Sequence, residues 1–553
     1  MGAVMKRSLL AGVAIIALSG GSALAADMPV KAPPIVCPAC DWSGFYVGVN
    51  AGGSIGRDHT NDSIALNPPG AFGAVAPGVV NPISNTAYSQ TLAGGIAGGQ
   101  AGFNWQSGKF VFGVEADWDW SGQRDNLQVN NWLASSTNVA PSGYIYNDEH
   151  KLNWLATVRG RLGWTTGNSL WYVTGGAAWG GVQSNYTFQA FNSPFFATNP
   201  AAANFGTSTK SGWTVGGGAE TSLAWMGMNH WSAKIEYLYV DLGTTTNTFA
   251  VPVPGSPAPG GPSAYTVTST SHIRDNLIRL GLNYRFGGEK WAPVPPSPGP
   301  CPTCNWTGFY VGVNAGGSIG QDRARDTDQL LPPTVNSANV TNPLTDVSHT
   351  LSPVGGLAGG QLGYNWQVGN FVIGAEGDFD WSGQRDSFSN TNFVASIVVV
   401  APAQVLISTE QKIEWLSTLR GRVGWTENCF LWYVTGGAAW GKVDANYAFQ
   451  SVQPNGGTIF TTAPFAANTS STKSGYTVGG GVETQLTWLG ASNHWSAKME
   501  YLYVDLGSIA NTFNVPTTVG NGVHSYTSTS NIRDHIIRVG LNYRFDAPVT
   551  AKY

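Results

Sequence analysis

The chain contains one long sequence twice, and this internal repeat limits the possible folds more than any other feature. The segment WSGFYVGVNAGGSIG at residues 42–56 returns as WTGFYVGVNAGGSIG at residues 306–320. The later matches keep their order: WSGQRD begins at Trp120 and Trp381, LWYVTGGAAWG at Leu170 and Leu431, EYLYVDLG at Glu236 and Glu500, and GLNYRF ends at Phe286 and Phe545. Two copies of one fold are therefore expected, at residues 41–286 and 305–545.

The segments outside the two copies are short. Residues 1–25 combine Lys6 and Arg7, an apolar run from Leu9 to Leu18 and a small-residue end, a pattern that predicts a cleaved secretory signal peptide. Residues 26–40 form a lead-in that contains Pro and Cys. Residues 287–304 form a linker whose prolines favour an extended spacer, and residues 546–553 are a C-terminal tail.

Inside each copy, apolar residues alternate with polar or small ones at a period of two, which is typical of β-strands. Between Phe110 and Trp120 the apolar side chains share one face, and Glu115, Asp117 and Asp119 share the other. Segments of this kind, each long enough for the about 9 to 11 residues that cross a bilayer, occur eight times per copy. In the first copy they begin near Trp42, Thr91, Phe110, Leu152, Leu170, Gly212, Trp231 and Arg274.

The connections between these segments alternate in length. Residues 106–109, 165–169 and 226–230 are short, whereas residues 57–90, 123–151, 187–211 and 244–272 are long and polar. Outer-membrane barrels have short periplasmic turns and longer external loops. We therefore expect the linker and both chain ends to face the periplasm.

The composition agrees with a membrane location. Charged residues make up only 11% of the chain, against about 25% in soluble domains, and a net charge of −4 gives no basic surface for nucleic acid. No apolar run reaches the about 20 residues of a spanning helix, so a closed barrel remains as the way to pair every backbone group in hydrocarbon. The expected fold class is all-β: two tandem eight-stranded antiparallel up-and-down transmembrane β-barrels, joined by the Pro-rich linker.

Several motifs resemble a known family. WSGFYVGVNAGG at Trp42, FVFGVEADWDWSG at Phe110, WLATVRGRLGW at Trp154, WYVTGGAAWG at Trp171 and RLGLNYRF at Arg279 are similar to the alpha-proteobacterial eight-stranded outer-membrane β-barrel surface antigens, also called porin-family or outer membrane immunogenic proteins. The resemblance covers both copies. It implies the cell outer membrane of a Gram-negative bacterium, variable surface loops, and a final aromatic residue recognised by the outer-membrane assembly machinery. Here Phe545 is followed by residues 546–553, so that signal is either internal or supplied by Tyr553.

The candidate functional residues are charged side chains on the inward faces of the strands. A small barrel is filled by its own side chains or holds one small ligand, and buried charges must be paired, so these residues are expected to form a salt-bridge plug rather than an ion path. Inward glycines such as Gly176 and Gly216 are expected to leave room for them. The predicted lumen network is Glu115, Arg159, Arg161, Glu220, Lys234, Glu236, Arg279 and Arg285, repeated as Glu376, Arg420, Arg422, Glu483, Lys498, Glu500, Arg538 and Arg544.

Two motifs imitate ligand sites. GGAAWGK at residues 436–442 has phosphate-loop spacing, but Val443 follows instead of Ser or Thr, no helix pattern follows, and the first copy has Gly181 in place of the Lys. The segment from Asp117 to Gly122 resembles the start of a calcium loop, yet position twelve is Gln128 rather than a bidentate Glu. We expect a strand and a strand end, respectively, and no metal or cofactor.

The five cysteines lie at Cys37, Cys40, Cys301, Cys304 and Cys429. Two CxxC pairs can indicate zinc or a redox site, but export leads to an oxidising compartment. A disulfide within or between the two Pro-rich segments is the preferred interpretation, and Cys429 has no partner in this scheme.

The histidines argue against catalysis. His59, His150, His349 and His524 fall in predicted loops without a repeated partner, His272 and His535 have no counterpart in the other copy, and His230 and His494 fall in a short turn. A nucleophile needs its base within hydrogen-bond reach, and no such pair is apparent. We expect no enzyme activity.

The expected function is structural and surface-displayed, with outer-membrane lipid, the assembly machinery and, through the loops, a host or extracellular ligand as partners. Two alternatives remain. One is a single sixteen-stranded porin-like channel for small solutes, because both copies begin and end on the same side of the membrane. The other is an adhesin or a haem-type small-ligand binding module that acts through external loops such as residues 61–88 and 321–348.

Overall fold

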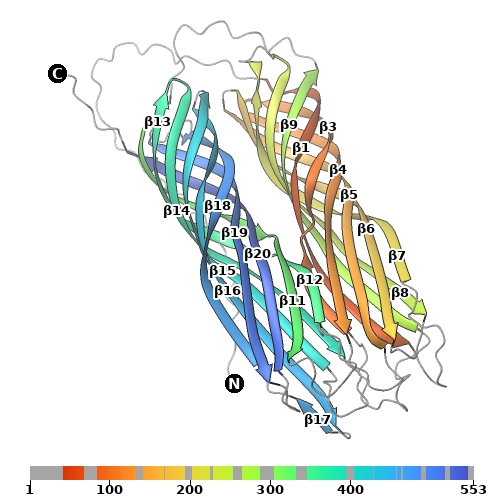
Figure 1. Ribbon diagram of the computed structural model, residues 1–553. Coiled ribbons are helices and arrows are strands. Elements are labelled where there is room, and N and C mark those ends of the chain that lie inside the picture. Colours follow the sequence, from red (N-terminus) through yellow and green to blue (C-terminus); the bar gives the residue numbers. More distant parts are fainter. Residues whose placement is uncertain are drawn as a thin grey trace, which may run out of the picture. The chain divides into compact units, whose positions relative to one another are not determined.

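The protein is an all-β chain in a computed structural model, which is drawn in Figure 1. The structure describes residues 41–67, 84–132, 141–166, 168–192, 202–224, 228–252, 264–286, 304–331, 345–393, 404–427, 429–455, 458–461, 465–486, 494–516 and 523–545. Within these ranges no helix is both long and apolar enough to pass through a membrane.

Both copies consist of long strands in the same order. The strands of copy one are β1 (Gly44–Asn67), β2 (Ser84–Gln90), β3 (Ala93–Ser107), β4 (Phe110–Trp132), β5 (Pro141–Thr166), β6 (Ser169–Asn192), β7 (Ala202–Ser222), β8 (Trp231–Pro252) and β9 (Ala264–Phe286). The strands of copy two are β10 (Gly308–Gly320), β11 (Asp322–Leu331), β12 (Thr345–Leu351), β13 (Val354–Val368), β14 (Phe371–Phe393), β15 (Gln404–Glu427), β16 (Phe430–Asn455), β17 (Thr458–Thr461), β18 (Phe465–Gln485), β19 (Trp495–Pro516) and β20 (Val523–Arg544).

Antiparallel ladders close the sheet of each copy. In copy one, β1 pairs with β3 on one side and with β9 on the other, so that Val47 lies opposite both Ala101 and Tyr284. Strands β3 to β9 pair in chain order. In copy two, β10 closes the sheet in the same way between β13 and β20. We name the two ends of the sheets by their connections: the turn end carries the short turn between Ser107 and Phe110, and the loop end carries the long ones.

The two copies exchange strands at the loop end. β2 continues the register of β3 along β1, but its other edge pairs with β14, where Ala87 lies opposite Ser389. β12 pairs with β11 and, reciprocally, with β4, where Ser348 lies opposite Gln128. Strand edges pair through backbone groups, which both copies present alike. The sequence pattern predicted two barrels without shared strands and did not indicate this exchange.

The strands are longer than their sequence pattern predicted. β4 has 23 residues and continues past Gln123, and β5 has 26 residues and begins at Pro141, so much of the expected loop between them is strand. The physical reason is that alternation continues there with buried aromatic and aliphatic side chains on the inward face, including Leu127, Val129, Tyr144 and Tyr146. Polar residues on the outward face made this region resemble a loop.

The alternation of faces agrees with the prediction. On β4, Phe112 and Val114 are 51% and 50% exposed, whereas Glu115 is 3% exposed. Exposed aromatic residues form two rims on the outside of copy one: Trp105, Phe110, Trp231 and Phe286 towards the turn end, and Trp118, Trp120, Trp179 and Trp213 towards the loop end. Amphipathic rings suit the headgroup level of a membrane, so the membrane-spanning segments lie between these rims.

Candidate functional site

The strand register brings opposite charges together inside copy one. Glu115 on β4 lies opposite Arg159 on β5, and Glu236 on β8 lies opposite Arg279 on β9. Cross-strand neighbours on one face have Cβ atoms about 4.5 to 5.5 Å apart. Each pair can therefore form an ion contact across one ladder, and the curvature of the sheet directs all four side chains into the lumen.

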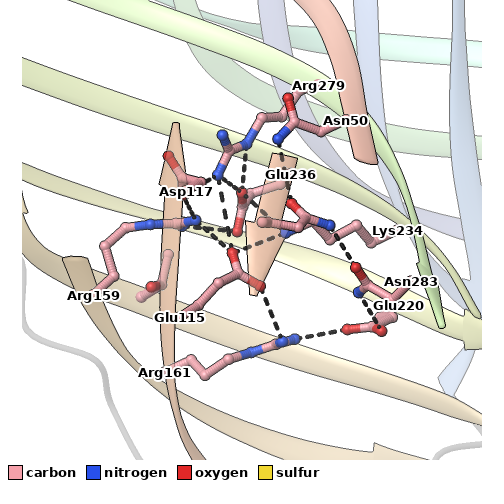
Figure 2. Close-up of polar contacts among 12 residues, drawn as sticks. Asn50, Glu115, Asp117, Arg159, Arg161, Glu220, Lys234, Glu236, Arg279 and Asn283 are labelled. Atoms are coloured by element: carbon pink, nitrogen blue, oxygen red, sulfur yellow. Dashed lines mark hydrogen bonds and ion pairs between the residues drawn. The ribbon is translucent and has the colours of Figure 1, made fainter. Parts of the chain in front are cut away.

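Two arginines form the centre of this charged layer (Figure 2). Arg159 lies 2.5 Å from Glu115, 2.6 Å from Asp117 and 2.9 Å from Glu236. Arg279 lies 2.7 Å from Glu236 and 2.8 Å from Asp117. It also lies 2.7 Å from Asp119. Both arginine side chains are 0% exposed. Each guanidinium thus contacts three carboxylates through its planar set of N–H donors, which makes Arg suited to buried ion pairs.

A second group lies closer to the turn end. Arg161 contacts Glu220 at 2.8 Å and the Tyr46 hydroxyl at 2.8 Å, and its guanidinium lies 4.0 Å from the Tyr172 ring centroid. The Tyr46 hydroxyl donates to Glu115 at 2.7 Å and joins the two groups. Lys234 also contacts Glu115, at 2.9 Å. Glu220 accepts from Ser232 at 2.5 Å and from Asn283 at 2.8 Å.

Copy two repeats the ion pairs of this layer, although Arg422 donates to the Asn365 side chain at 2.8 Å where Arg161 donates to the Tyr46 hydroxyl. Arg420 lies 2.5 Å from Glu376 and 2.8 Å from Glu500. Arg538 lies 2.8 Å from Glu500. The remaining contacts are Arg420 to Asp378 at 2.7 Å, Arg538 to Asp378 at 2.7 Å and to Asp380 at 2.6 Å, Arg422 to Glu483 at 3.1 Å, and Lys498 to Glu376 at 2.7 Å.

Four carboxylates of these layers were not among the residues predicted for the lumen network. Asp117 and Asp119 were expected on the polar strand face with Glu115, and Asp378 and Asp380 are their counterparts in copy two, and all four bind the central arginines. Charge balance is the signal that could have found them. The predicted set of copy one has five cations and three carboxylates, and the two aspartates on the same strand face supply the missing negative charges.

Arg285 and Arg544 lie apart from the central contacts, at the turn end. Arg285 donates to the Ser43 carbonyl at 3.0 Å and lies 5.2 Å from the Trp42 ring centroid. Arg544 lines a small space together with Trp306. Both therefore lie nearer the turn end than the central arginines of their copies do.

Apolar layers cover the charged layer of copy one on both sides. At the turn end, Trp42 packs with Val111, Leu170 and Tyr172 and is 0% exposed. Towards the loop end lies a buried apolar cluster of Leu92, Ile96, Leu152, Leu155, Ala178, Val182, Leu238, Val240, Leu242, Ile273 and Leu277. Copy two has matching clusters around Trp306 and around Leu502. The ions are thus enclosed by apolar side chains along the axis of each sheet.

The inward glycines have two roles. A Cβ at Gly176 would overlap the carbonyl oxygen of Val158, and a Cβ at Gly216 would overlap that of Tyr237, so these two allow neighbouring backbones to approach closely. Other inward glycines leave room for the cations, as expected: a Cβ at Gly281 would lie 2.9 Å from Cγ of Lys234.

A further polar cluster lies beyond the loop-end rim of copy one. His150 is buried, 3.1 Å from Asp148 and 3.6 Å from Asp58. Burial opposes its protonation, but the two carboxylates outweigh burial and raise the pKa of His150 well above its usual value. Burial, together with Asp148, raises the pKa of Asp62 to about 7. The Tyr88 hydroxyl donates to Asp62 at 2.8 Å and to Asp148 at 2.6 Å.

The histidine positions differ from the prediction. His59, His150, His349 and His524 lie in strands rather than loops, and the last three are buried. His524 lies 3.0 Å from Asp328, and His349 stacks on Phe388. These positions were predicted as loops because the polar outward residues near the strand ends resembled loop sequence. His150 Nε2 lies 3.3 Å from the Tyr186 hydroxyl, and the neighbours of His349 and His524 include the carboxylates of Asp326 and Asp328.

Both sequence motifs lie in strands. GGAAWGK lies within β16, as expected, and Lys442 there forms an ion pair with Glu414 at 2.7 Å. Asp117 and Asp119 were expected at a strand end but lie inside β4, which continues to Trp132. Among the described residues no group of His, Cys, Asp and Glu is arranged to hold a metal ion.

The cysteine interpretation needs a correction. Cys304 forms a disulfide with Cys429, which lies in the turn between β15 and β16. The expectation that Cys429 has no partner is therefore wrong. Sequence spacing could not reveal this pair, because it joins positions 125 residues apart that become neighbours only when the sheet closes. Cys37, Cys40 and Cys301 lie outside the described residues.

Comparisons with known proteins agree with this architecture. A family model described as "Outer membrane protein beta-barrel domain" matches residues 13–286 and 303–545. The 31 kDa outer-membrane immunogenic protein of Brucella melitensis biotype 1 is 32% identical over 263 residues, which cover 46% of this chain and 89% of that protein. The 22 kDa outer membrane protein of Rhizobium leguminosarum bv. viciae is 30% identical over 213 residues, which cover 37% of this chain and 67% of that protein.

A solved structure, that of Ail, the attachment invasion locus protein of Yersinia pestis, aligns with 40% of this chain and 97% of its own at 11% identity and a TM-score of 0.16, too low to support an argument. The two family-model matches and the two named relatives confirm the resemblance inferred from the motifs and locate the protein in the outer membrane. The chain therefore belongs to the outer membrane protein beta-barrel domain family and carries two copies of that domain in tandem.

Proposed function

We propose that this protein is a structural, surface-displayed component of the outer membrane whose two lumens are closed by buried salt bridges. Its domains are a signal peptide at residues 1–25, a lead-in at 26–40, barrels at 41–286 and 305–545 with a linker at 287–304, and a tail at 546–553. Residues 1–40, 287–303 and 546–553 lie outside the described residues. The turn end faces the periplasm and the loop end faces outwards, in keeping with the connection lengths.

The observation that carries this proposal is the burial of the charged layer. Arg159, Arg279 and Glu236 have side chains that are 0% exposed, and each is in contact with opposite charges. An ion that passed through the lumen would have to break these contacts, and removing one partner from a buried pair costs about 3 to 5 kcal/mol. A closed lumen needs no cofactor and no catalytic group, so neither is part of the proposal.

The experiment measures solute entry into proteoliposomes that contain the full-length protein. Swelling in a small sugar is expected to match that of protein-free liposomes. A variant that replaces both Arg159 and Arg420 by Ala provides the comparison, because it removes one central cation from each lumen. Rapid swelling with the unmodified protein would refute a closed lumen.

A single wide channel remains the second candidate, because one observation favours it. The exchange of β2 and β12 joins the sheets of the two copies at the loop end. A protease site introduced near Pro295 distinguishes two separate barrels from a single wide channel. Twin barrels keep the fast, unboiled gel mobility of folded barrels after cleavage, whereas a sixteen-stranded ring loses it.

We propose outer-membrane lipid, the assembly machinery and a loop-bound ligand as partners. The apolar outer band between the rims faces outer-membrane lipid, and the assembly machinery inserts the strands. A ligand held by the external loops, in the manner of an adhesin or a haem-type binding module, would contact the predicted loops at residues 61–88 and 321–348. The flanking parts of these loops are strand in β1, β2, β11 and β12, and residues 68–83 and 332–344 lie outside the described residues. Loss of binding after exchange of these segments tests that role.

A further inference from the structure

A fork separates β7 from β8 in the half of copy one nearest the loop end. Between Trp213 and Ser222, β7 pairs with β8, and Trp213 lies opposite Asp241. Beyond this point β7 remains paired with β6, and β8 remains paired with β9. In the described ranges no ladder joins residues 202–212 of β7 to β8. One edge of this eleven-residue stretch therefore carries backbone groups that face no described strand.

The sequence around the fork explains why the strands part. The register of β8 along β9 shifts between Asp241 and Gly243, which leaves Leu242 as an extra residue. Gly243 has φ +74°, and its N–H donates to the Asp241 carboxylate at 2.9 Å. Such a β-bulge bends a strand. At the base of the fork, a Cβ at Gly212 would overlap the carbonyl oxygen of Asp241, so only Gly fits there.

Copy two repeats the same device. β18 pairs with β19 only between Tyr476 and Gln485. Gly507 has φ +76°, its N–H donates to Asp505 at 2.9 Å, and a Cβ at Gly475 would overlap the Asp505 carbonyl oxygen. Both copies thus contain the bulge, the aspartate that accepts a hydrogen bond from the bulge glycine, and the glycine at the base of the fork. The fork is therefore a feature of both copies.

The free edge is accessible and weakly protected. None of residues 203–213 is buried, and Phe205 is 69% exposed. Natural edge strands are usually protected by charged residues, proline or a covering element. Here Lys210 is the one charge in residues 202–212, and its Nζ lies 3.5 Å from the Thr244 carbonyl, at the base of the fork.

β8 is held away from this edge by contacts of its own. The Asn247 amide donates to the Tyr186 hydroxyl at 3.0 Å, and the Phe249 ring lies 5.5 Å from the Tyr186 ring. In copy two, Asn511 and Phe513 contact Tyr447 in the same way, and Phe513 also stacks on Phe465 of β18. For β8 to pair with residues 202–212 of β7, these contacts would have to break.

We propose that the free edge of β7, residues 202–212, binds an extended polypeptide segment as an added β-strand, and that the matching edge of β18, residues 465–475, binds a second one. Main-chain hydrogen bonds provide the affinity in this mode, and alternate side chains provide the specificity. The edge favours an uncharged segment with an apolar residue that can lie against Phe205.

A peptide with the sequence of residues 243–252, GTTTNTFAVP, is the probe. If the ladder continued beyond Trp213 and Asp241, Phe249 would lie opposite Phe205, because each is eight residues from the base of the fork. Fluorescence anisotropy with the refolded full-length protein should show saturable binding of the labelled peptide. Two further versions carry N-methyl groups on the odd-numbered or on the even-numbered residues, and only one of these sets of amides faces β7. One of the two methylated peptides should therefore bind at least tenfold more weakly than the unmethylated peptide. Equal binding of all three peptides would overturn the proposal.

Proline substitutions test the edge itself. Ser208 and Thr209 are neighbours, so the N–H of one points to β6 and that of the other points to the free edge. Of S208P and T209P, the edge-facing variant should keep the unboiled gel mobility of the unmodified protein and lose peptide binding by tenfold or more. Two folded variants with unchanged binding would contradict strand addition.

Amide hydrogen exchange keeps the test informative if both proline variants fail to fold. In the unmodified protein, amides of residues 203–211 should alternate between slow exchange, where they face β6, and fast exchange, where they face the fork. Addition of the unmethylated peptide should slow the fast set. Uniform slow exchange without peptide would show that the fork is closed and would overturn the proposal.

Discussion

The charged layers and the loop-end clusters of the two copies differ in how closely they repeat. In the charged layer, Arg159 and its partners recur in copy two with the same residue types and similar distances. At the loop end the copies have diverged: His150 corresponds to Gln411, and Tyr88 corresponds to His349. A buried ion can be changed only together with its partners. A mixed polar and aromatic cluster permits single replacements that keep its volume and hydrogen bonds.

The largest effect is expected from removing a central cation. Arg159→Ala leaves Glu115, Asp117 and Glu236 buried with less opposing charge. Breaking a buried pair costs about 3 to 5 kcal/mol, so the urea midpoint of copy one should fall markedly, and Arg420→Ala should do the same to copy two. Arg285→Ala, which removes a contact to a backbone carbonyl, is the matched control. An equal, small effect of all three would contradict the comparison.

The disulfide should produce the next largest effect, and in copy two alone. Cys304 and Cys429 close a loop across 125 positions, whereas copy one has Asn168 where copy two has Cys429. Disulfides of this kind contribute about 2 to 4 kcal/mol. C304S should therefore lower the denaturation midpoint of β15 and β16, measured by hydrogen exchange, without changing β5 and β6. Reactivity of Cys429 with a thiol reagent before reduction would show that the bond is absent.

A smaller effect is expected from pH at the loop end of copy one. The pKa of Asp62 is about 7 in the folded protein, because of burial and Asp148, against 3.8 for an ordinary Asp. Between these values the unfolded chain loses a proton that the folded chain retains, so stability falls as pH rises from about 4 to 7, and the raised pKa of His150 continues the fall above that range. Exchange protection around Tyr88, corrected for intrinsic rates, should follow this trend. Asp62→Asn should weaken the trend, and a protection profile that rises with pH would contradict it.

The smallest effect is expected on the outer surface. Lys442 has Gly181 as its counterpart in copy one, and it forms a solvent-exposed ion pair with Glu414. Surface pairs of this kind contribute little to stability. Lys442→Gly should leave the urea midpoint and the gel mobility of the protein unchanged. A large loss would mean that outward charges stabilise the sheet more than the comparison of the copies implies.

The sequence predicted the parts of the fold that depend on local alternation. The inward position of Glu115 and the outward position of Phe112 follow from the period of two, which holds along β4 up to the register shift between Trp120 and Gln123. The strand ends were placed too early. Around Leu127 and Tyr146 the outward residues are polar because that part lies beyond the membrane rim, so the hydrophobic signal on which the prediction relied is weaker there.

The features that the sequence did not reveal depend on which distant segments meet. The two copies offer β2 equivalent backbone edges on β4 and on β14, so sequence patterns cannot choose between them. Cys304 and Cys429 become neighbours only through closure of the second sheet. The charged layer was partly predictable, because paired charges must face the lumen. Its missing members, Asp117 and Asp119, follow from charge balance.

Conductance across a planar lipid bilayer tests most directly whether the paired charges close both lumens. The unmodified full-length protein should insert without producing a steady current, because each lumen is closed by buried ion pairs between apolar layers. A steady ohmic current from the unmodified protein, unchanged when Arg159 and Arg420 are both replaced by Ala, would contradict this account.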